Sequence, residues 1–259
     1  MQGDRRQEET RPGLVLIHGA AHAGDCWAPT VAELARQAPD LPVLAVDLPG
    51  RRDNPADLRT LTIAQCVDSV IEQVAAAGLD GDVVVVGHSL AGLVAPGVVA
   101  RLGAGRVRRL VLVAAIVPPE GGSVVDTLRG PTRWLVARAA RRAAPRRVPP
   151  RPLARWLFCN GMDRAQREYV LARLCEESTV TPAEPVSRTD LPASVPRTWV
   201  LPRRDRMVRP RQQRRGIDAL GGVEEVLELD TGHDAMVGAP SALAAILASR
   251  CEPVVSRGD

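Results

Sequence analysis

Lysine is absent from the 259-residue chain, so all 34 basic residues are arginine, and aromatic side chains are scarce, with four tryptophans, one tyrosine and one phenylalanine. Together with abundant alanine, valine, glycine and proline, this arginine bias is typical of a GC-rich genome and indicates no particular function. The formal net charge of +4 is small for this length and does not indicate nucleic-acid binding. No nucleic-acid partner is therefore expected.

Disulfide bonds and a targeting segment are not expected either. The five cysteines are widely spaced, odd in number and include no Cys-x-x-Cys pair, which favours free thiols in a reducing compartment. Residues 1–12 are charged and lack an apolar core, so they predict a flexible tail rather than a signal peptide. The uncharged run 83–100 is long enough to span a membrane, but it contains two polar side chains, three glycines and a proline. The sequence predicts a cytoplasmic protein without a membrane partner.

One stretch, residues 83–102, organises the rest of the chain. Its four consecutive valines predict a strand buried on both faces of a parallel sheet. The hexapeptide GHSLAG (87–92) separates this strand from a predicted helix that contains Pro96, where a kink is expected. A serine at such a sharp strand-to-helix turn presents its hydroxyl above the sheet edge, beside the positive end of the helix. Ser89 is therefore the predicted nucleophile.

This stretch resembles the nucleophile elbow of the α/β-hydrolase family. The usual pattern there is Gly-x-Ser-x-Gly, and this chain has Ala91 in place of the second glycine, with Gly92 one position later. Flanking residues must be small because larger side chains would collide at the strained turn. Alanine is still small enough, so we interpret the departure as a tolerated variant.

Strands and helices alternate on both sides of a long interruption. Strands are predicted over 14–17, 41–47, 83–86, 107–117, 198–201 and 223–229. The clearest helix begins at a capping box formed by Thr62 and Gln65 and ends at Gly78, and others are predicted over 164–175, 211–220 and 240–251. This alternation predicts an α/β fold with a mostly parallel, doubly wound sheet and a ligand site at the carboxyl ends of the strands.

The interruption, residues 120–196, contains no good strand, many prolines and arginines, and a few helical pieces. An insertion between two sheet strands, above the edge that carries the chemistry, is typical of a cap. We therefore predict an α/β-hydrolase core made of residues 13–119 and 197–259, with a helical cap over 120–196.

A serine hydroxyl becomes a good nucleophile only when a base removes its proton, and an acid must orient that base. The chain has only four histidines, and His233 follows the last predicted strand, where the family presents its general base. The acid is expected between the serine and the histidine in sequence, at a strand end. Asp205 meets that requirement and is predicted to be the acid, with Asp230 as the alternative.

The family resemblance also implies an oxyanion hole made of two backbone N–H groups. One is expected from Leu90, directly after the nucleophile, and the other from Ala20 in a His-Gly-x motif after the first strand. His18 and His22 are spaced i, i+4 as in some zinc sites, but they follow a strand and no glutamate completes the motif. No metal and no other cofactor are expected.

Three stretches, HGAAHAGDCW (18–27), GHSLAG (87–92) and TGHDAM (231–236), together resemble the methylesterase and hydroxynitrile lyase branch of the α/β-hydrolases. The resemblance covers the predicted core, roughly 13–118 and 197–250. It implies a serine hydrolase that cleaves an ester of a small, largely apolar molecule through an acyl-enzyme. The plant lyases of this branch rely on an active-site lysine, which this chain lacks, so lyase activity is not expected.

Other kinds of function remain open. One is a thioesterase, acyltransferase or cyclase acting on a carrier-bound or natural-product substrate, and another is a ligand receptor on a hydrolase scaffold. Fold by itself does not decide between them. In the predicted cap, large apolar residues either line the substrate pocket, as we predict, or form the cap's own core: Trp134, Trp156, Leu157, Phe158 and Met162.

Charge is distributed unevenly over the predicted cap. Nine arginines and no acidic residue lie between Arg129 and Arg155. They form either the solvated outer face of the cap helices or a docking surface for an anionic partner, such as an acidic carrier protein or a carboxylate-bearing substrate. Arginine suits the second role because its planar guanidinium binds carboxylates and phosphates bidentately.

Overall fold

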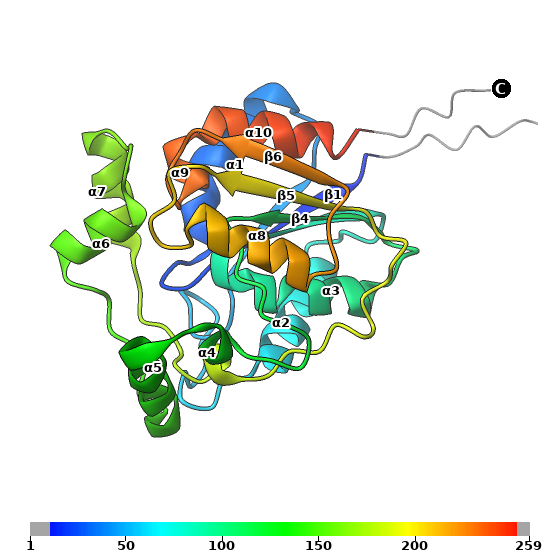
Figure 1. Ribbon diagram of the computed structural model, residues 1–259. Coiled ribbons are helices and arrows are strands. Elements are labelled where there is room, and N and C mark those ends of the chain that lie inside the picture. The colour runs from blue at the N-terminus through cyan, green and yellow to red at the C-terminus, as the bar shows by residue number, and fades with distance from the viewer. Residues whose placement is uncertain (1–10, 253–259) are drawn as a thin grey trace, which may run out of the picture.

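The computed structural model, which describes residues 11–252, contains one six-stranded sheet (Figure 1). The strands are β1 (Gly13–Ile17), β2 (Val43–Val46), β3 (Val83–His88), β4 (Val107–Val113), β5 (Arg197–Pro202) and β6 (Glu225–Leu229). Their order across the sheet is β2-β1-β3-β4-β5-β6, and every pairing is parallel. The predicted doubly wound parallel sheet is thereby confirmed. Residues 1–10 of the predicted tail lie outside the described residues.

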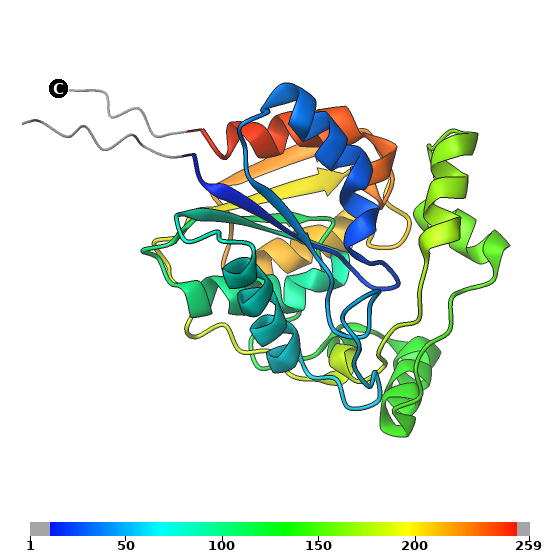
Figure 2. The same cartoon turned by 180° about the vertical axis from the view of Figure 1, so that it is seen from behind.

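Helices cover both faces of this sheet (Figures 1 and 2). One face carries α2 (Ile63–Ala76), α3 (Ala95–Leu102) and α8 (Pro210–Ala219), and the other carries α1 (Ala28–Gln37), α9 (Ala235–Gly238) and α10 (Pro240–Ser249). The predicted capping box of α2 is present, since the Gln65 N–H donates to Thr62 Oγ1 and the Thr62 N–H donates to Gln65 Oε1. Within residues 11–252, each helix is too short or too polar to cross a membrane.

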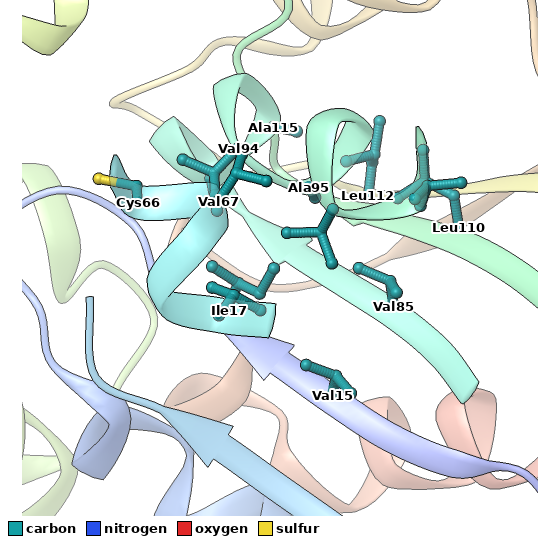
Figure 3. Packing of buried hydrophobic residues seen from close by; sticks show 14 of the residues in the cluster. Val15, Ile17, Cys66, Val67, Val85, Val94, Ala95, Leu110, Leu112 and Ala115 are labelled. Atoms are coloured by element: carbon teal, nitrogen blue, oxygen red, sulfur yellow. The ribbon is translucent and has the colours of Figure 1, made fainter. Parts of the chain in front are cut away.

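The alternation of side chains along each strand gives the sheet two apolar cores. Alternate residues of β1, β3 and β4 pack under α2 and α3 (Figure 3): Val15, Ile17, Val85, Leu110 and Leu112. Their neighbours in sequence pack under α1 and α10: Leu14, Leu16, Val84, Val86 and Val111. The valine run is therefore buried on both sides, as predicted for a central parallel strand.

The segment between β4 and β5 contains α4 (Val124–Thr127), α5 (Gly130–Arg142), α6 (Arg151–Phe158), α7 (Arg164–Arg173) and the short 3-10 helix η3 (Thr181–Ala183). We use cap only as a name for residues 120–196. Helices α6 and α7 contribute buried side chains to the core under α1 and α10, whereas α5 stands apart from the sheet (Figure 1) and buries none of its residues.

Two predicted elements differ from the structure near the sheet edge. Strand β4 ends at Val113 rather than at residue 117, because Ala114 has a φ of +50° and turns the chain; the residues that follow stay apolar because they remain buried. The predicted helix after Ser89 is divided into a 3-10 helix, η2 (Ser89–Leu93), and α3. Pro96 causes no kink because it occupies the first turn of α3, where no backbone donor is required.

Candidate active site

Ser89 lies at the turn between β3 and η2. Its φ of +53° falls in the left-handed region, which costs a non-glycine residue about 1–3 kcal/mol. Glycines make room for this turn: a Cβ on Gly19 would lie 2.7 Å from Ser89 Cβ, and one on Gly87 would lie 2.8 Å from Ala95 Cβ. The turn therefore holds the serine at the carboxyl end of β3, against the loop that follows β1.

The glycine required after the serine is Gly92 rather than residue 91. A Cβ on Gly92 would collide with the carbonyl oxygen of Ile116, and the Ile116 N–H donates to the Ser89 carbonyl at 2.9 Å. Ala91, in contrast, is buried in the core under α2 and α3, where its methyl group has packing partners. This explains in physical terms why the chain tolerates alanine at the position where the family pattern has glycine.

Ser89, His233 and Asp205 form one hydrogen-bonded chain across the ends of β3, β6 and β5. His233 Nε2 lies 2.9 Å from Ser89 Oγ, and His233 Nδ1 lies 2.8 Å from Asp205 Oδ2. Both the imidazole and the carboxylate are almost completely buried. Because a carboxylate only accepts hydrogen bonds, Nδ1 carries the proton and Nε2 is free to accept from the serine hydroxyl.

The carboxylate of Asp205 is fixed by three further donors. Its Oδ1 accepts the backbone N–H groups of Met207 and Val208, each at 2.8 Å, and its Oδ2 also accepts from Gln213 Nε2 at 3.1 Å. Gln213 is completely buried, and its Oε1 accepts from Trp199 Nε1 at 3.1 Å. No sequence signal marked Gln213, because it is one polar residue within the polar stretch that becomes α8.

Asp230, the alternative acid, does not contact His233. Its side chain is 63% exposed and forms an ion pair with Arg204 at 3.1 Å. Of the two carboxylates that the sequence left open, the structure therefore brings only Asp205 to the histidine.

The two predicted oxyanion donors belong to segments that adjoin the serine. Leu90 is the second residue of η2, and the N–H groups of a first helical turn have no partner within the helix. The Ala20 N–H belongs to the loop that packs on Ser89 and donates to no group within the described part of the chain. Both residues also line the cavity described below.

Each peptide group around Ala20 is anchored by a side chain. His18 Nδ1 donates to the Gly19 carbonyl at 2.9 Å, and His22 Nδ1 donates to the Ala20 carbonyl at 2.8 Å. The Ala21 N–H donates to Glu177 Oε2 at 2.9 Å. Ala21 itself has a φ of +61°, so the loop is strained and these hydrogen bonds hold it in place.

His18 is neutral and has one tautomer. Its Nε2 accepts the Leu48 N–H at 3.1 Å while its Nδ1 donates to the Gly19 carbonyl. Burial lowers the pKa of His18 to about 3. The hydrogen bonds occupy both ring nitrogens, so His18 has neither nitrogen free for the zinc site weighed above.

His22 is charged, because both of its ring nitrogens face acceptors. Its Nε2 donates to Asp234 Oδ2 at 3.0 Å, opposite the bond to the Ala20 carbonyl. Burial by itself lowers the pKa of His22, but the Asp234 carboxylate outweighs burial and raises that pKa above its ordinary value. The pKa of Asp234 is lowered, since the attraction of His22 outweighs the effect of burial on the carboxylate. The pair connects the Ala20 loop to the residue after His233.

His88 packs directly against His233. Its Nε2 donates to the His233 carbonyl at 3.1 Å, and burial lowers its pKa well below the ordinary value, so it is neutral. Ligand atoms of His88, His233 and Asp234 lie within 4.8 Å of one another. Because the hydrogen bonds above engage His88 Nε2 and both nitrogens of His233, we interpret this cluster as support for the His233 loop.

A second buried ion pair connects the cap to the same loop. Arg51 Nη2 lies 2.7 Å from Glu177 Oε2, and the two side chains are only 2% and 8% exposed. Arg51 Nε also donates to the His22 carbonyl at 2.9 Å, and Glu177 Oε1 accepts the Ser178 N–H at 2.8 Å. The cap thus supplies one of the groups that position the Ala20 loop. Neither residue was marked by a sequence motif.

A cavity of about 800 Å³ opens above Ser89. Core residues that follow β4 form part of its wall, including Ile116 and Val117, and the cap contributes residues from α4, α5 and the 177–182 segment. The cap residues of α5 that line it are spaced as one helical face: Thr132, Leu135, Val136 and Ala139. The wall is largely apolar, with charged side chains at a few positions.

The five cap residues predicted to line the substrate pocket do not line this cavity. Trp134 and Trp156 are 57% and 48% exposed, each with an arginine side chain over its ring. Leu157, Phe158 and Met162 instead pack into the core under α1 and α10, together with strand residues, and so do not form a separate core of the cap. The Phe158 ring centroid lies 6.0 Å from that of His233.

The family model described as the alpha/beta hydrolase family matches residues 14–246. Among curated proteins, a carbendazim hydrolyzing esterase from Nocardioides sp. (strain SG-4G) is 34% identical over 115 residues. That match covers 44% of this chain and 46% of the relative, so it spans about half the length of the curated protein.

Solved structures match over nearly the whole chain. An extracellular α/β-hydrolase from a Paenibacillus species, described as sharing structural and functional homology with tobacco salicylic acid binding protein 2, has a TM-score of 0.81 at 20% identity and covers 93% of this chain and 100% of its own. A methylesterase from Arabidopsis has a TM-score of 0.70 at 16% identity, with 92% and 98% covered.

At these identities the structural likeness shows the fold, and it agrees with the resemblance to the methylesterase branch predicted from the motifs. The family model extends over both parts of the sheet and the segment between them. This chain belongs to the alpha/beta hydrolase family.

Proposed function

We propose that the protein is a serine hydrolase that cleaves an ester of a small, largely apolar molecule through an acyl-enzyme. One observation carries this proposal: Ser89 Oγ lies 2.9 Å from His233 Nε2, and Asp205 fixes the opposite side of the same ring, beside a cavity of about 800 Å³. Both distances are short enough for direct hydrogen bonding and proton transfer.

In this proposal Ser89 Oγ attacks the ester carbonyl carbon while His233 Nε2 takes the hydroxyl proton. The carbonyl π electrons move to the oxygen, and the tetrahedral intermediate collapses as His233 returns the proton to the leaving alcohol. Water then attacks the acyl-enzyme with His233 as base, which releases the acid and restores Ser89. Asp205 holds Nδ1–H and stabilises the imidazolium that forms in each step.

The negative charge on the intermediate's oxygen is bound, we infer, by the N–H groups of Ala20 and Leu90. These groups are supported as donors by their position beside Ser89 and by the side chains that fix the peptides around Ala20. Removing one such donor typically costs about 3–4 kcal/mol of transition-state stabilisation.

The largely apolar cavity wall supports a substrate whose acyl or alcohol part is mainly hydrocarbon. Burying such a group contributes about 25 cal/mol per Å² of apolar area. The volume is within the range of small-molecule sites, which favours a substrate larger than a simple acetate.

A second candidate is a thioesterase or acyltransferase acting on a carrier-bound chain. The observation that favours it is α5, a helix with no buried residue and with Arg133, Arg138, Arg141 and Arg142 in or near solvent. An acidic carrier protein is the partner that such a surface would attract. The chemistry would be the same up to the acyl-enzyme.

The test begins with a fluorophosphonate probe, which should label the wild type once and should not label Ser89→Ala. Labelling of that variant at the wild-type rate would refute the assignment of Ser89. A panel of esters and thioesters, run with both proteins, then distinguishes steady turnover from a single burst, which would indicate a receptor.

A matched pair of substitutions tests the acid. Asp205→Asn should lower kcat/KM for p-nitrophenyl butyrate by several orders of magnitude, since the amide favours the wrong histidine tautomer. Asp230→Asn should leave it nearly unchanged, because the Asp230 side chain is exposed and paired with arginine. A larger loss in Asp230→Asn would overturn the assignment.

A further inference from the structure

Three arginines line the cavity that contains Ser89. Arg129 is the N-cap residue of α5, Arg146 follows the same helix, and Arg215 lies on α8 in the core. They come from three separate segments and converge on one space. All three are exposed, and within residues 11–252 none of them belongs to an ion pair.

The acidic groups on the cavity wall do not balance this charge. Asp126 accepts from the Ser123 N–H and hydroxyl and lies 3.2 Å from Arg133, which is outside the cavity lining. Glu177 is paired with the buried Arg51 and accepts two backbone N–H groups. Each lining carboxylate therefore already has its own cation, and the three arginines leave the wall with an excess of positive charge.

The N-terminus of α5 adds to this excess of positive charge. Its N-cap residue, Arg129, provides no side-chain acceptor for the first-turn N–H groups, and the same first turn lines the cavity through Arg129 and Thr132. The N-terminus of a helix carries a partial positive charge equivalent to roughly half an elementary charge. The helix dipole and the guanidinium groups thus both favour an anionic ligand.

Apolar residues line the same cavity as these charges and the serine. Leu128, Leu135, Val136 and Val208 line the cavity together with Ser89 and Leu90. A substrate that fills the cavity would therefore place hydrocarbon against this wall and a charged end near the arginines. Guanidinium groups bind carboxylates through paired N–H donors.

We propose that this cavity binds esters whose acyl or alcohol part ends in a carboxylate, with Arg129, Arg146 and Arg215 binding that carboxylate at a distance from the scissile bond. This inference rests on the proposed serine hydrolase function and narrows its substrate class. It differs from docking of an acidic carrier protein, because it assigns the charge recognition to the cavity-lining arginines and not to the outer face of the cap.

The test compares mono-p-nitrophenyl esters of dicarboxylic acids, from succinate to suberate, with p-nitrophenyl alkanoates of the same chain length. The wild type should prefer the carboxylate-bearing ester at the chain length that reaches the arginines, and added salt should reduce that preference. Arg129→Gln, Arg146→Gln and Arg215→Gln should each lower the ratio of the two kcat/KM values, by about twofold to fivefold per arginine. The triple variant should abolish the preference.

Arg147→Gln with Arg155→Gln is the matched control, since these exposed residues belong to the same arginine-rich cap but do not line the cavity. This control should leave both rates unchanged. An equal loss of preference in the control would assign the effect to the general charge of the cap and overturn the inference. A wild type that shows no preference at any chain length would also overturn the inference, and so would a triple variant that keeps the preference for the carboxylate-bearing ester. Failure of the proposed function would look different, because neutral-ester hydrolysis would then persist in Ser89→Ala.

Discussion

Replacing Glu177 by glutamine should slow catalysis in addition to destabilising the fold. The Glu177 carboxylate accepts the Ala21 N–H at 2.9 Å, while His22 holds the carbonyl of the same Ala20–Ala21 peptide group at 2.8 Å. The neighbouring N–H, that of Ala20, is the proposed oxyanion donor. A substitution of Glu177 should therefore displace the Ala20 N–H by releasing this one strained peptide group, and not by a general loss of packing.

The magnitude follows from burial and from the number of bonds lost. Glu177 and Arg51 are 8% and 2% exposed, so glutamine leaves a buried guanidinium without its countercharge. Breaking a buried pair costs about 3–5 kcal/mol, and the retained amide oxygen should limit the loss to about 2–3 kcal/mol. An oxyanion donor that is removed costs about 100-fold to 1,000-fold in kcat, so one that is displaced should cost about tenfold to 100-fold.

Glu184→Gln provides a matched control from the same part of the cap. Glu184 Oε2 also accepts a backbone N–H of the core, that of Ile63 at 2.9 Å, but this bond is at the start of α2 and not in the Ala20 loop. Both variants should lose stability in urea unfolding. Only Glu177→Gln should lose kcat for p-nitrophenyl butyrate and, in parallel, affinity for a trifluoromethyl ketone, which forms an oxyanion when Ser89 adds to it. Equal kcat in the two variants, at a temperature where both are folded, would refute the reasoning.

Two further predictions concern the same edge of the sheet. The pKa of His22 is raised above its ordinary value of 6.5, so the stabilisation by its pair with Asp234 is complete below about pH 6.5 and is lost as the pH rises through the raised pKa. In urea unfolding, the difference in stability between wild type and Asp234→Asn should therefore shrink as the pH rises. A difference that does not change with pH would contradict this. Gly92→Ala should lower the melting temperature and kcat more than Ala91→Gly, since only the former creates a clash with the Ile116 backbone. The reverse order in thermal unfolding would refute the assignment of Gly92 as the required glycine of this turn.

The parts of the site that the sequence could predict are those fixed by strand ends. Ser89, Asp205 and His233 come one, three and four residues after the ends of β3, β5 and β6. Because parallel strands end at one edge of the sheet, position along the chain was enough to bring them together. The sequence favoured Asp205 but kept Asp230 as the alternative, since both lie between the serine and the histidine in the chain. The structure distinguishes them by their surroundings, with Asp205 at His233 and Asp230 exposed beside Arg204.

The cap could not be predicted in the same way. Residue type favoured its tryptophans as pocket residues, but the face of α5 that lines the cavity is defined by spacing and includes Thr132 and Ala139. A helical pattern over residues 128–139 was the signal that could have found it. Glu177 offered no local signal, since its partner Ala21 lies 156 positions away in the chain.

The two buried ion pairs at the Ala20 loop are better explained by positioning than by stability. Taking four charged groups out of water is costly, and apolar residues of similar size would often stabilise such sites as well or better. Ala21, however, has a strained φ of +61°, and an apolar replacement could neither accept its N–H nor donate to the carbonyls of Ala20 and His22. Because each cation has its own carboxylate, His22 with Asp234 and Arg51 with Glu177, the two pairs hold the loop without adding a net charge beside the site. Preorganised N–H donors of this kind need no rearrangement when the oxyanion forms, which is where such groups contribute most to the rate.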